Sequence, residues 1–207
     1  MTTTPPAPPA GPRLEDGDVF ADVTFSEVAL EGADLSGKDL QRCTFRRCKL
    51  PGSRWARAKL EDCLFEDCDL TGMVPEALAL RGVTFKGTKL MGVDWTLLGK
   101  LPDLGFEGCD LRYCSFVKLR LRATRFRGCV AREANFIELD LTEADFTGSD
   151  LTGSTIQGCL LAKTDFSRAN GVFFDPQRNR VKGARIAIGT AVLLVKSLGM
   201  EVDGFDE

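Results

Sequence analysis

Large apolar residues recur at every fifth position along most of the chain. A first series begins at Phe20 and runs to Trp95 with few exceptions. After Trp95 the pattern moves by one residue, and a second series runs from Phe106 to Ile186. Two positions before most of these residues stands a smaller one, usually Ala, Cys, Ser, Thr or Val. The other positions are mostly polar, so each unit of five has two inward positions.

A period of five fits neither an α-helix, which repeats after about 3.6 residues, nor a simple strand. The two inward positions lie two apart, as on one face of an extended segment, and glycine often follows where the chain must turn. A sandwich of amphipathic strands has no reason to keep a five-residue register over so many units. Stacked coils do have one, because each coil packs on its neighbours, and the sequence therefore predicts a β-helical rod.

Several segments resemble the A(D/N)LXX signature of pentapeptide-repeat proteins, namely Ala33–Gly37, Ala144–Gly148 and Ser149–Gly153. The resemblance extends roughly over residues 18–188. It implies an all-β fold, a right-handed quadrilateral β-helix with four repeats per coil, in which residues twenty apart stack. About eight coils are expected, which at ~4.8 Å per coil gives a rod ~40 Å long, followed by a short C-terminal α-helix.

Three regions follow from this pattern. Residues 1–13 are rich in proline and are expected to form a disordered tail. Residues 14–188 are expected to form the β-helix, in two halves joined by a break near 96–105. Residues 189–207 are expected to form a capping or dimerisation helix and an acidic tail.

The break requires one extra residue to leave the stack, and Pro102 cannot donate to a β-ladder. It is either a simple bulge or a projecting loop that contacts a partner. On the second interpretation the contact residues are Trp95, Leu98, Leu101 and Pro102. A second interruption at Met73–Ala77 keeps the register, so we expect one distorted side there.

After Ile188 the spacing becomes helical. Thr190 is positioned to cap a helix over 191–198, which Gly199 ends. Its apolar face is formed by Ala191, Leu194, Val195 and Leu198. Such a short helix is expected to cover the open end of the rod. The family resemblance also implies a homodimer formed through this end.

No catalytic constellation is present in the sequence. The chain has no histidine, and no nucleophile motif, phosphate-binding loop or dinucleotide fingerprint. All eight cysteines stand at the small inward position, so Cys43 should stack on Cys63 and Cys48 on Cys68. Core packing explains this spacing better than a zinc site does. We therefore expect no enzyme activity, no cofactor and no metal.

The charge pattern excludes other classes of function. The formal net charge is −3, which disfavours direct binding of nucleic acid. Neither a secretory signal nor a membrane span is recognisable, so a cytoplasmic location without membrane contact is expected. Residues 112–132 are basic, whereas the following stretch is acidic. The expected acidic surface consists of Glu138, Asp140, Glu143, Asp145, Asp150 and Asp165.

The family resemblance suggests a function. Met91–Thr96 and Lys182–Ile186 are similar to segments of the members that protect bacterial type II topoisomerases from albicidin or, in the Qnr type, from quinolones. Those members are described as imitating duplex DNA. The resemblance thus implies a rod that binds DNA gyrase or topoisomerase IV and protects it from, or modulates it against, a poison, as in antibiotic resistance or self-immunity. Acids and bases nearly balance along this rod, however, and an interaction scaffold with an unrelated protein partner is the alternative.

Overall fold

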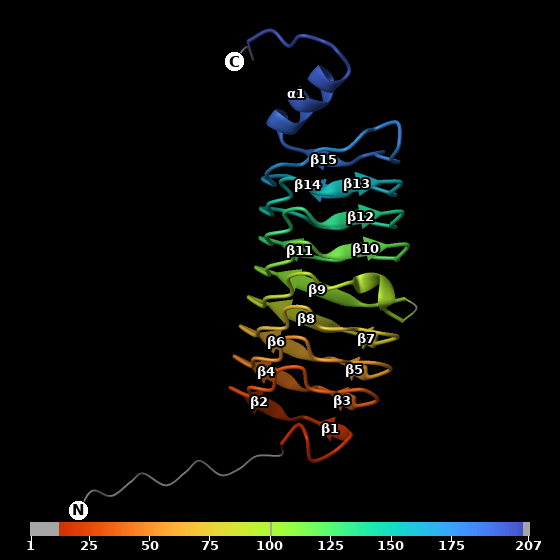
Figure 1. Cartoon of the computed structure of the whole chain (residues 1–207). Coiled ribbons are helices and arrows are strands. Elements are labelled where there is room, and N and C mark those ends of the chain that lie inside the picture. The colour runs from red at the N-terminus through yellow and green to blue at the C-terminus, as the bar shows by residue number, and fades with distance from the viewer. Residues whose placement is uncertain (1–12, 100, 205–207) are drawn as a thin grey trace, which may run out of the picture.

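The computed structural model describes residues 13–99 and 101–204. In this range the chain forms a right-handed quadrilateral β-helix of about eight coils with one short helix at its C-terminal end, as the sequence predicts (Figure 1). The predicted disordered tail, residues 1–13, lies outside the described residues except for Arg13. No helix in the described part of the chain has the length and apolar character that crossing a membrane requires.

The strands are short, and most have a buried central residue flanked by more exposed ones. They are β1 (Val19–Ala21), β2 (Thr24–Ser26), β3 (Asp39–Gln41), β4 (Thr44–Arg46), β5 (Lys59–Glu61), β6 (Leu64–Glu66), β7 (Ala79–Arg81), β8 (Val83–Lys86), β9 (Leu104–Glu107), β10 (Ser115–Val117), β11 (Phe126–Arg127), β12 (Asn135–Ile137), β13 (Thr155–Gln157), β14 (Asp165–Phe166) and β15 (Arg185–Ile186). A 3-10 helix, η1, spans Trp95–Leu97, and the α-helix α1 spans Ile188–Ser197.

Most strands pair in parallel with the equivalent strands of the coils before and after them. The sheets run β1-β3-β5-β7, β2-β4-β6-β8-β9-β11, β10-β12-β13 and β14-β15. Phe25 pairs with Phe45, twenty residues later, whereas Phe85 pairs with Phe106, twenty-one residues later. The structure thus confirms the predicted shift of one residue at the break, after which the register of twenty returns.

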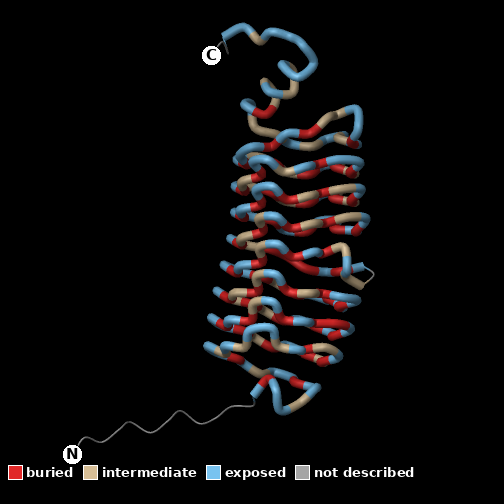
Figure 2. Tube along the Cα trace, viewed as in Figure 1, coloured by how far each residue is buried: buried red, intermediate tan, exposed pale blue. Residues whose placement is uncertain are grey.

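The core is built from columns of stacked side chains, and buried residues alternate with exposed ones along the whole tube (Figure 2). One column stacks phenylalanines with ring centroids 4.5 to 5.5 Å apart: Phe25, Phe45, Phe65, Phe85, Phe106, Phe126, Phe146 and Phe166. Trp55, Trp95, Phe116 and Phe136 belong to a second column and meet the first edge to face. Such contacts add to the apolar area that each ring buries.

Each corner of the rod places the residue two after the large apolar one in the left-handed region. Gly32 has a φ of 62° there, but Arg42 at the equivalent position has a φ of 50°. The turn was predicted at this position, yet glycine is not required. The cost of such a conformation, about 1–3 kcal/mol, is offset by the surrounding structure, for example by the Arg42 N–H, which donates to the Glu61 carbonyl at 2.8 Å.

Met73–Ala77 does not distort the rod, contrary to expectation. Pro75 is buried at the large inward position, and the preceding Val74 bridges Arg54 in the usual parallel register. The Leu78 N–H closes the corner by donating to the Pro75 carbonyl at 3.1 Å. Proline fits because its ring is apolar and its fixed φ suits an extended side of the coil.

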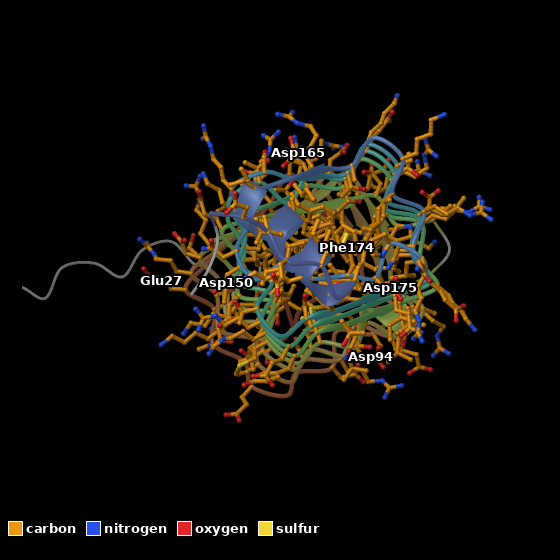
Figure 3. The ribbon with its side chains drawn as sticks, turned by 90° about the horizontal axis from the view of Figure 1, so that it is seen from above. Glu27, Asp94, Asp150, Asp165, Phe174 and Asp175 are labelled. Carbon is orange, nitrogen blue, oxygen red and sulfur yellow. The ribbon has the colours of Figure 1, made fainter. Side chains whose placement is uncertain are left out.

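Both ends of the rod are covered. At the N-terminal end Leu14 is buried, and Lys38 occupies a small inward position, where its Nζ donates to the Gly17 carbonyl at 2.5 Å. At the other end Phe174 is buried and α1 lies across the opening (Figure 3).

The predicted N-cap of the helix is wrong. The helix begins at Ile188 with Ala187 as its N-cap, which provides no side-chain hydrogen bond. Thr190 is buried inside the first turn instead. Packing on the last coil, rather than a capping hydroxyl, therefore fixes where the helix starts.

Candidate functional site

The loop that follows η1 breaks the regular surface of the rod. Asp94 caps η1 by accepting a hydrogen bond from the Thr96 N–H at 3.0 Å. Between η1 and β9 the chain takes up the extra residue, and Leu101 adopts a φ of 55°. Among the described residues with positive φ, Leu101 is the only aliphatic one larger than alanine. Its side chain is 67% exposed.

Two of the four predicted contact residues are not available to a partner. Trp95 is 0% exposed because its ring stacks on Phe116 at 5.9 Å and meets Phe106 edge to face. Pro102 is also buried. The prediction is therefore wrong for these two side chains; Trp95 points inward because it is in phase with the repeat, whereas Pro102 is out of phase and is buried at the loop itself. Leu98 packs partly against the core, and with Leu101 it remains at the surface.

A groove lies beside this loop. We call it the loop groove; it has a volume of about 840 Å³, and its lining includes Leu98, Leu101, Val117, Leu119 and Arg120. A second hollow of about 640 Å³ adjoins the loop groove, and Leu101, Pro102 and Arg120 line both. Val117 is in register with Ile137 across β10 and β12, and Val117 forms part of the groove.

Cations surround the two hollows. Lys118 and Arg120 line the loop groove, and Arg122 and Arg125 line the second hollow, together with one acid, Asp103. Arg120 has no ion-pair partner within residues 13–99 and 101–204. The other three cations have partners at 3.7 Å, and the pairs are Lys118–Glu138, Arg122–Asp140 and Arg125–Glu107. These loose pairs leave much of the positive charge available.

The six predicted acidic residues do not form a bare acidic surface, because each has a cation within reach. The pairs are Glu138–Lys118 at 3.7 Å, Asp140–Arg122 at 3.7 Å, Glu143–Lys163 at 3.2 Å, Asp145–Arg127 at 2.5 Å, Asp150–Arg132 at 2.6 Å and Asp165–Arg185 at 3.1 Å. The basic and acidic stretches are consecutive in sequence, but the coil places them side by side. Their charges therefore largely cancel locally.

The aspartates that precede the large apolar residue also stabilise the corners. Asp150 accepts a hydrogen bond from the Thr152 N–H at 3.1 Å, and Asp165 accepts one from the Ser167 N–H at 2.8 Å. The hydrogen bonds from Thr152, supported by Arg132, lower the pKa of Asp150. Those from Ser167 lower the pKa of Asp165. A carboxylate held in this way acts as a turn residue.

The eight cysteines are all free and buried. All of these thiols except that of Cys129 lie against a carbonyl oxygen of the preceding coil, as Cys48 Sγ does at 3.3 Å from the Phe25 oxygen. Burial raises the pKa of Cys63 to about 11 and that of Cys114 to about 12. The thiols of Cys63 and Cys114 therefore stay protonated at neutral pH and are poor nucleophiles and metal ligands. The pKa of Cys48 is instead lowered to about 7 by its hydrogen bond with the Cys68 thiol. In the described part of the chain, no group of three or more Cys, Asp or Glu residues is arranged to hold a metal ion.

The C-terminal helix leaves apolar side chains in solvent. Ala191, Leu194 and Val195 are partly buried toward the rod, whereas Leu198 is 55% exposed. The other exposed large apolar residues at this end are Phe173, Ile188, Leu193 and Met200. Sequence reasoning placed Leu198 on the covered face, and it missed this second group because helical spacing alone does not show which face meets the rod.

Arg120 and Leu119 were also missed as members of a site. The signal was present in the sequence, because the one-residue shift and the start of the basic stretch are close together. Only the register across the break shows that they face the same hollow.

Comparison with known proteins gives a consistent result for the fold. Residues 19–95 match the profile described as the pentapeptide repeat region, and residues 114–153 match the one described as pentapeptide repeats in eight copies. Together they cover more than half of the chain. None of the curated proteins compared matches this sequence.

Among solved structures, a trypsin-treated form of QnrB1, described as a plasmid-mediated fluoroquinolone resistance protein, has a TM-score of 0.61 at 20% identity. The match covers 90% of this chain and 99% of that one. A second trypsin-treated form of QnrB1 has a TM-score of 0.50 at 19% identity, covering 86% of this chain and 99% of that one. HetL, described as involved in heterocyst differentiation regulation in the cyanobacterium Nostoc, has a TM-score of 0.30 at 20% identity, with 80% and 88% covered. The repeat, its register and both profile matches agree: this chain belongs to the pentapeptide-repeat family.

Proposed function

We propose that this protein is a non-catalytic rod that binds a bacterial type II topoisomerase, DNA gyrase or topoisomerase IV, in the cytoplasm and protects it from a poison. The observation that carries the proposal is the match to QnrB1 along 90% of this chain and 99% of that one. Qnr-type members protect such enzymes from quinolones.

Dimensions support the proposal. About eight coils at ~4.8 Å each give a length of ~40 Å. One turn of duplex DNA is about 34 Å long. A straight rod of this length has the shape needed to occupy a saddle that normally holds a short stretch of duplex.

The surface charge of the rod supports the topoisomerase proposal less well than its dimensions do. A phosphate backbone presents unpaired negative charge at regular intervals, whereas Asp145 and Asp150 are each bonded to an arginine. We therefore assign the topoisomerase contact to the shape of the rod and to Leu98 and Leu101, rather than to the six carboxylates alone. The same pairing favours a second candidate function, a protein-binding scaffold whose partner has no relation to DNA.

We also propose that two copies associate through the C-terminal end. Ile188, Leu193, Leu198 and Met200 are exposed apolar side chains on and just after one short helix, and an interface that covers some of them would remove apolar surface from water. Light scattering after gel filtration tests this. Changing both Leu193 and Leu198 to Asp should give a monomer, whereas Val19→Asp at the opposite end should not. A wild-type monomer at all concentrations would exclude the dimer.

The decisive experiment is supercoiling of relaxed plasmid by gyrase, with and without a quinolone, as the protein is titrated. We expect supercoiling to recover in the presence of the drug at near-stoichiometric protein. Val19→Asp should behave like the wild type. If neither poisoned nor free gyrase responds at micromolar protein, the topoisomerase proposal is wrong and the scaffold function takes its place.

A further inference from the structure

We infer that the loop groove is a docking site for an acidic polypeptide segment that carries large apolar side chains. The inference goes beyond the proposed function, because it concerns the chemistry of a ligand segment and does not depend on which protein carries that segment. Three features of the described residues support it: the shape of the groove, its apolar wall and its unneutralised cations.

The shape comes from the interruption in the stack. The sheet β1-β3-β5-β7 ends at β7, and on the far side of the break the bridge Arg120–Asp140 resumes the ladder on that face. Between them lie the hollows of about 840 and 640 Å³, which share Leu101 and Arg120. A further hollow that shares Leu119 and Arg120 continues toward Leu160, and the acids Glu138 and Asp140 also line it. This succession of hollows suits a segment of polypeptide better than a small molecule.

The wall of the loop groove is apolar. Leu98, Leu101, Val117 and Leu119 all contribute to it. Leu101 is held in the left-handed region with a φ of 55°, at a conformational cost to an L-residue. Its 67% exposure means that burial within this chain recovers little of that cost. Exposed, strained apolar side chains of this kind are typical of recognition sites.

The cations select the charge of the ligand. Arg120 has no ion-pair partner within the described ranges, and Arg122 and Arg125 have partners only at 3.7 Å. By contrast, Arg127 and Arg132, at the following corners of the coil, form closer ion pairs. Arg127 lies 2.5 Å from Asp145, and Arg132 lies 2.6 Å from Asp150. Charged side chains around an apolar wall favour carboxylates at the edges and apolar groups at the centre.

A nucleic acid fits these features less well. Its phosphates would contact the cations, but a phosphate backbone offers nothing to the leucines and to Val117. Stacking platforms for bases are also not part of the groove, since its lining contains no aromatic side chain. The structure therefore assigns the groove to a peptide with both acidic and apolar side chains.

Fluorescence anisotropy tests the inference with three labelled probes at low and at moderate salt. The first is a short peptide in which aspartates flank a leucine and a phenylalanine; the second replaces the aspartates by lysines; the third is a single-stranded oligonucleotide. We expect the acidic peptide to bind, the basic peptide not to bind, and affinity to fall as salt rises.

Two variants identify the site. Leu101→Gly removes the apolar side chain and suits the local φ of 55°, so it should fold normally and weaken binding about tenfold or more. Arg120→Glu reverses the free cation and should weaken binding by a similar factor. The matched controls are Lys89→Glu, which reverses an exposed cation on another side, and Val19→Asp. Both should bind like the wild type.

Several results would overturn the inference. One is no binding of the acidic peptide to the wild type; another is equal loss of binding in the control variants. Stronger binding of the oligonucleotide would make the groove a phosphate site instead. The gyrase assay reports separately: peptide binding without protection of gyrase rejects the topoisomerase proposal and leaves the docking site standing.

Discussion

The two halves of the rod share one interior but differ in their surfaces. Phe65, before the break, stacks on Phe45 at 4.5 Å, and Phe146, after it, stacks on Phe126 at 4.5 Å. Outside, the first half pairs charges twenty residues apart, as in Arg42–Asp22 at 2.7 Å. Several pairs of the second half instead join residues eighteen apart, as in Arg127–Asp145 at 2.5 Å.

The sheets differ as well. Before the break, β1, β3, β5 and β7 form a sheet on one side of the rod, whereas after it β10, β12 and β13 form one on the neighbouring side. The interior is determined by the five-residue period, because every inward position must fill the same space. Outward positions are free of that constraint. The fold therefore identifies the family, and the partner must be read from the surface.

The largest effect should come from breaking the phenylalanine column, and it should be equal in the two halves. Phe65→Ala and Phe146→Ala each remove a fully buried ring from two stacked neighbours. Each should lower the free energy of unfolding by about 3–5 kcal/mol. Chemical denaturation monitored by circular dichroism measures this. A clear difference between the two variants would contradict the claim of a common interior.

The next effect concerns polar groups in the small inward column. Thr88 Oγ1 donates to the Phe65 carbonyl at 3.1 Å and accepts from the Cys68 N–H at 3.3 Å. Ser149 Oγ makes the equivalent bonds to the Phe126 carbonyl and from the Cys129 N–H.

Thr88→Val and Ser149→Ala should each cost about 1–3 kcal/mol, because each leaves a buried backbone N–H and carbonyl unsatisfied. The same denaturation experiment applies, and Ser26→Ala on the exposed surface is the control. If either variant is as stable as the wild type, the column is held by packing alone.

A smaller effect depends on pH and is expected for the aspartates at the corners of the second half. The folded pKa of Asp150 and Asp165 lies below its usual value because of the bonds from Thr152 and Ser167. Such groups stabilise the fold above the unfolded pKa of about 3.9, and this stabilisation is lost as pH falls through the folded pKa. Asp150→Asn should therefore reduce the loss of stability between pH 4 and 2. An unchanged acid limb of the stability profile would show that other carboxylates dominate.

The smallest effect should come from single ion pairs at the corners. Arg42→Gln and Arg127→Gln break pairs whose side chains are largely in solvent, where water and salt weaken the attraction. Both variants should unfold close to the wild type, and the difference should vanish at high salt. A large loss from Arg127→Gln alone would mean that the second half depends on its surface charges.

The sequence alone predicts the interior of this protein well and its surface poorly. Period and register follow from the inward residues, and even the one-residue shift between Phe85 and Phe106 was predictable. The same reasoning failed for Trp95, since a residue at a loop was taken as exposed although it is in phase with the core. Neutralisation of Asp145 and Asp150 was not foreseen, because it depends on arginines one coil away. Thr190 has the chemistry of a cap, but packing moved the helix start.

The twenty-residue coil also has a consequence for distance. The rod can lengthen or shorten only by whole coils, in steps of ~4.8 Å, because any other insertion must leave the stack as Leu101 does. The number of coils between Leu101 and the helix α1 therefore determines the distance between these two places. A partner that contacts both places would detect the removal of a single coil, although the core of every remaining coil would be unchanged.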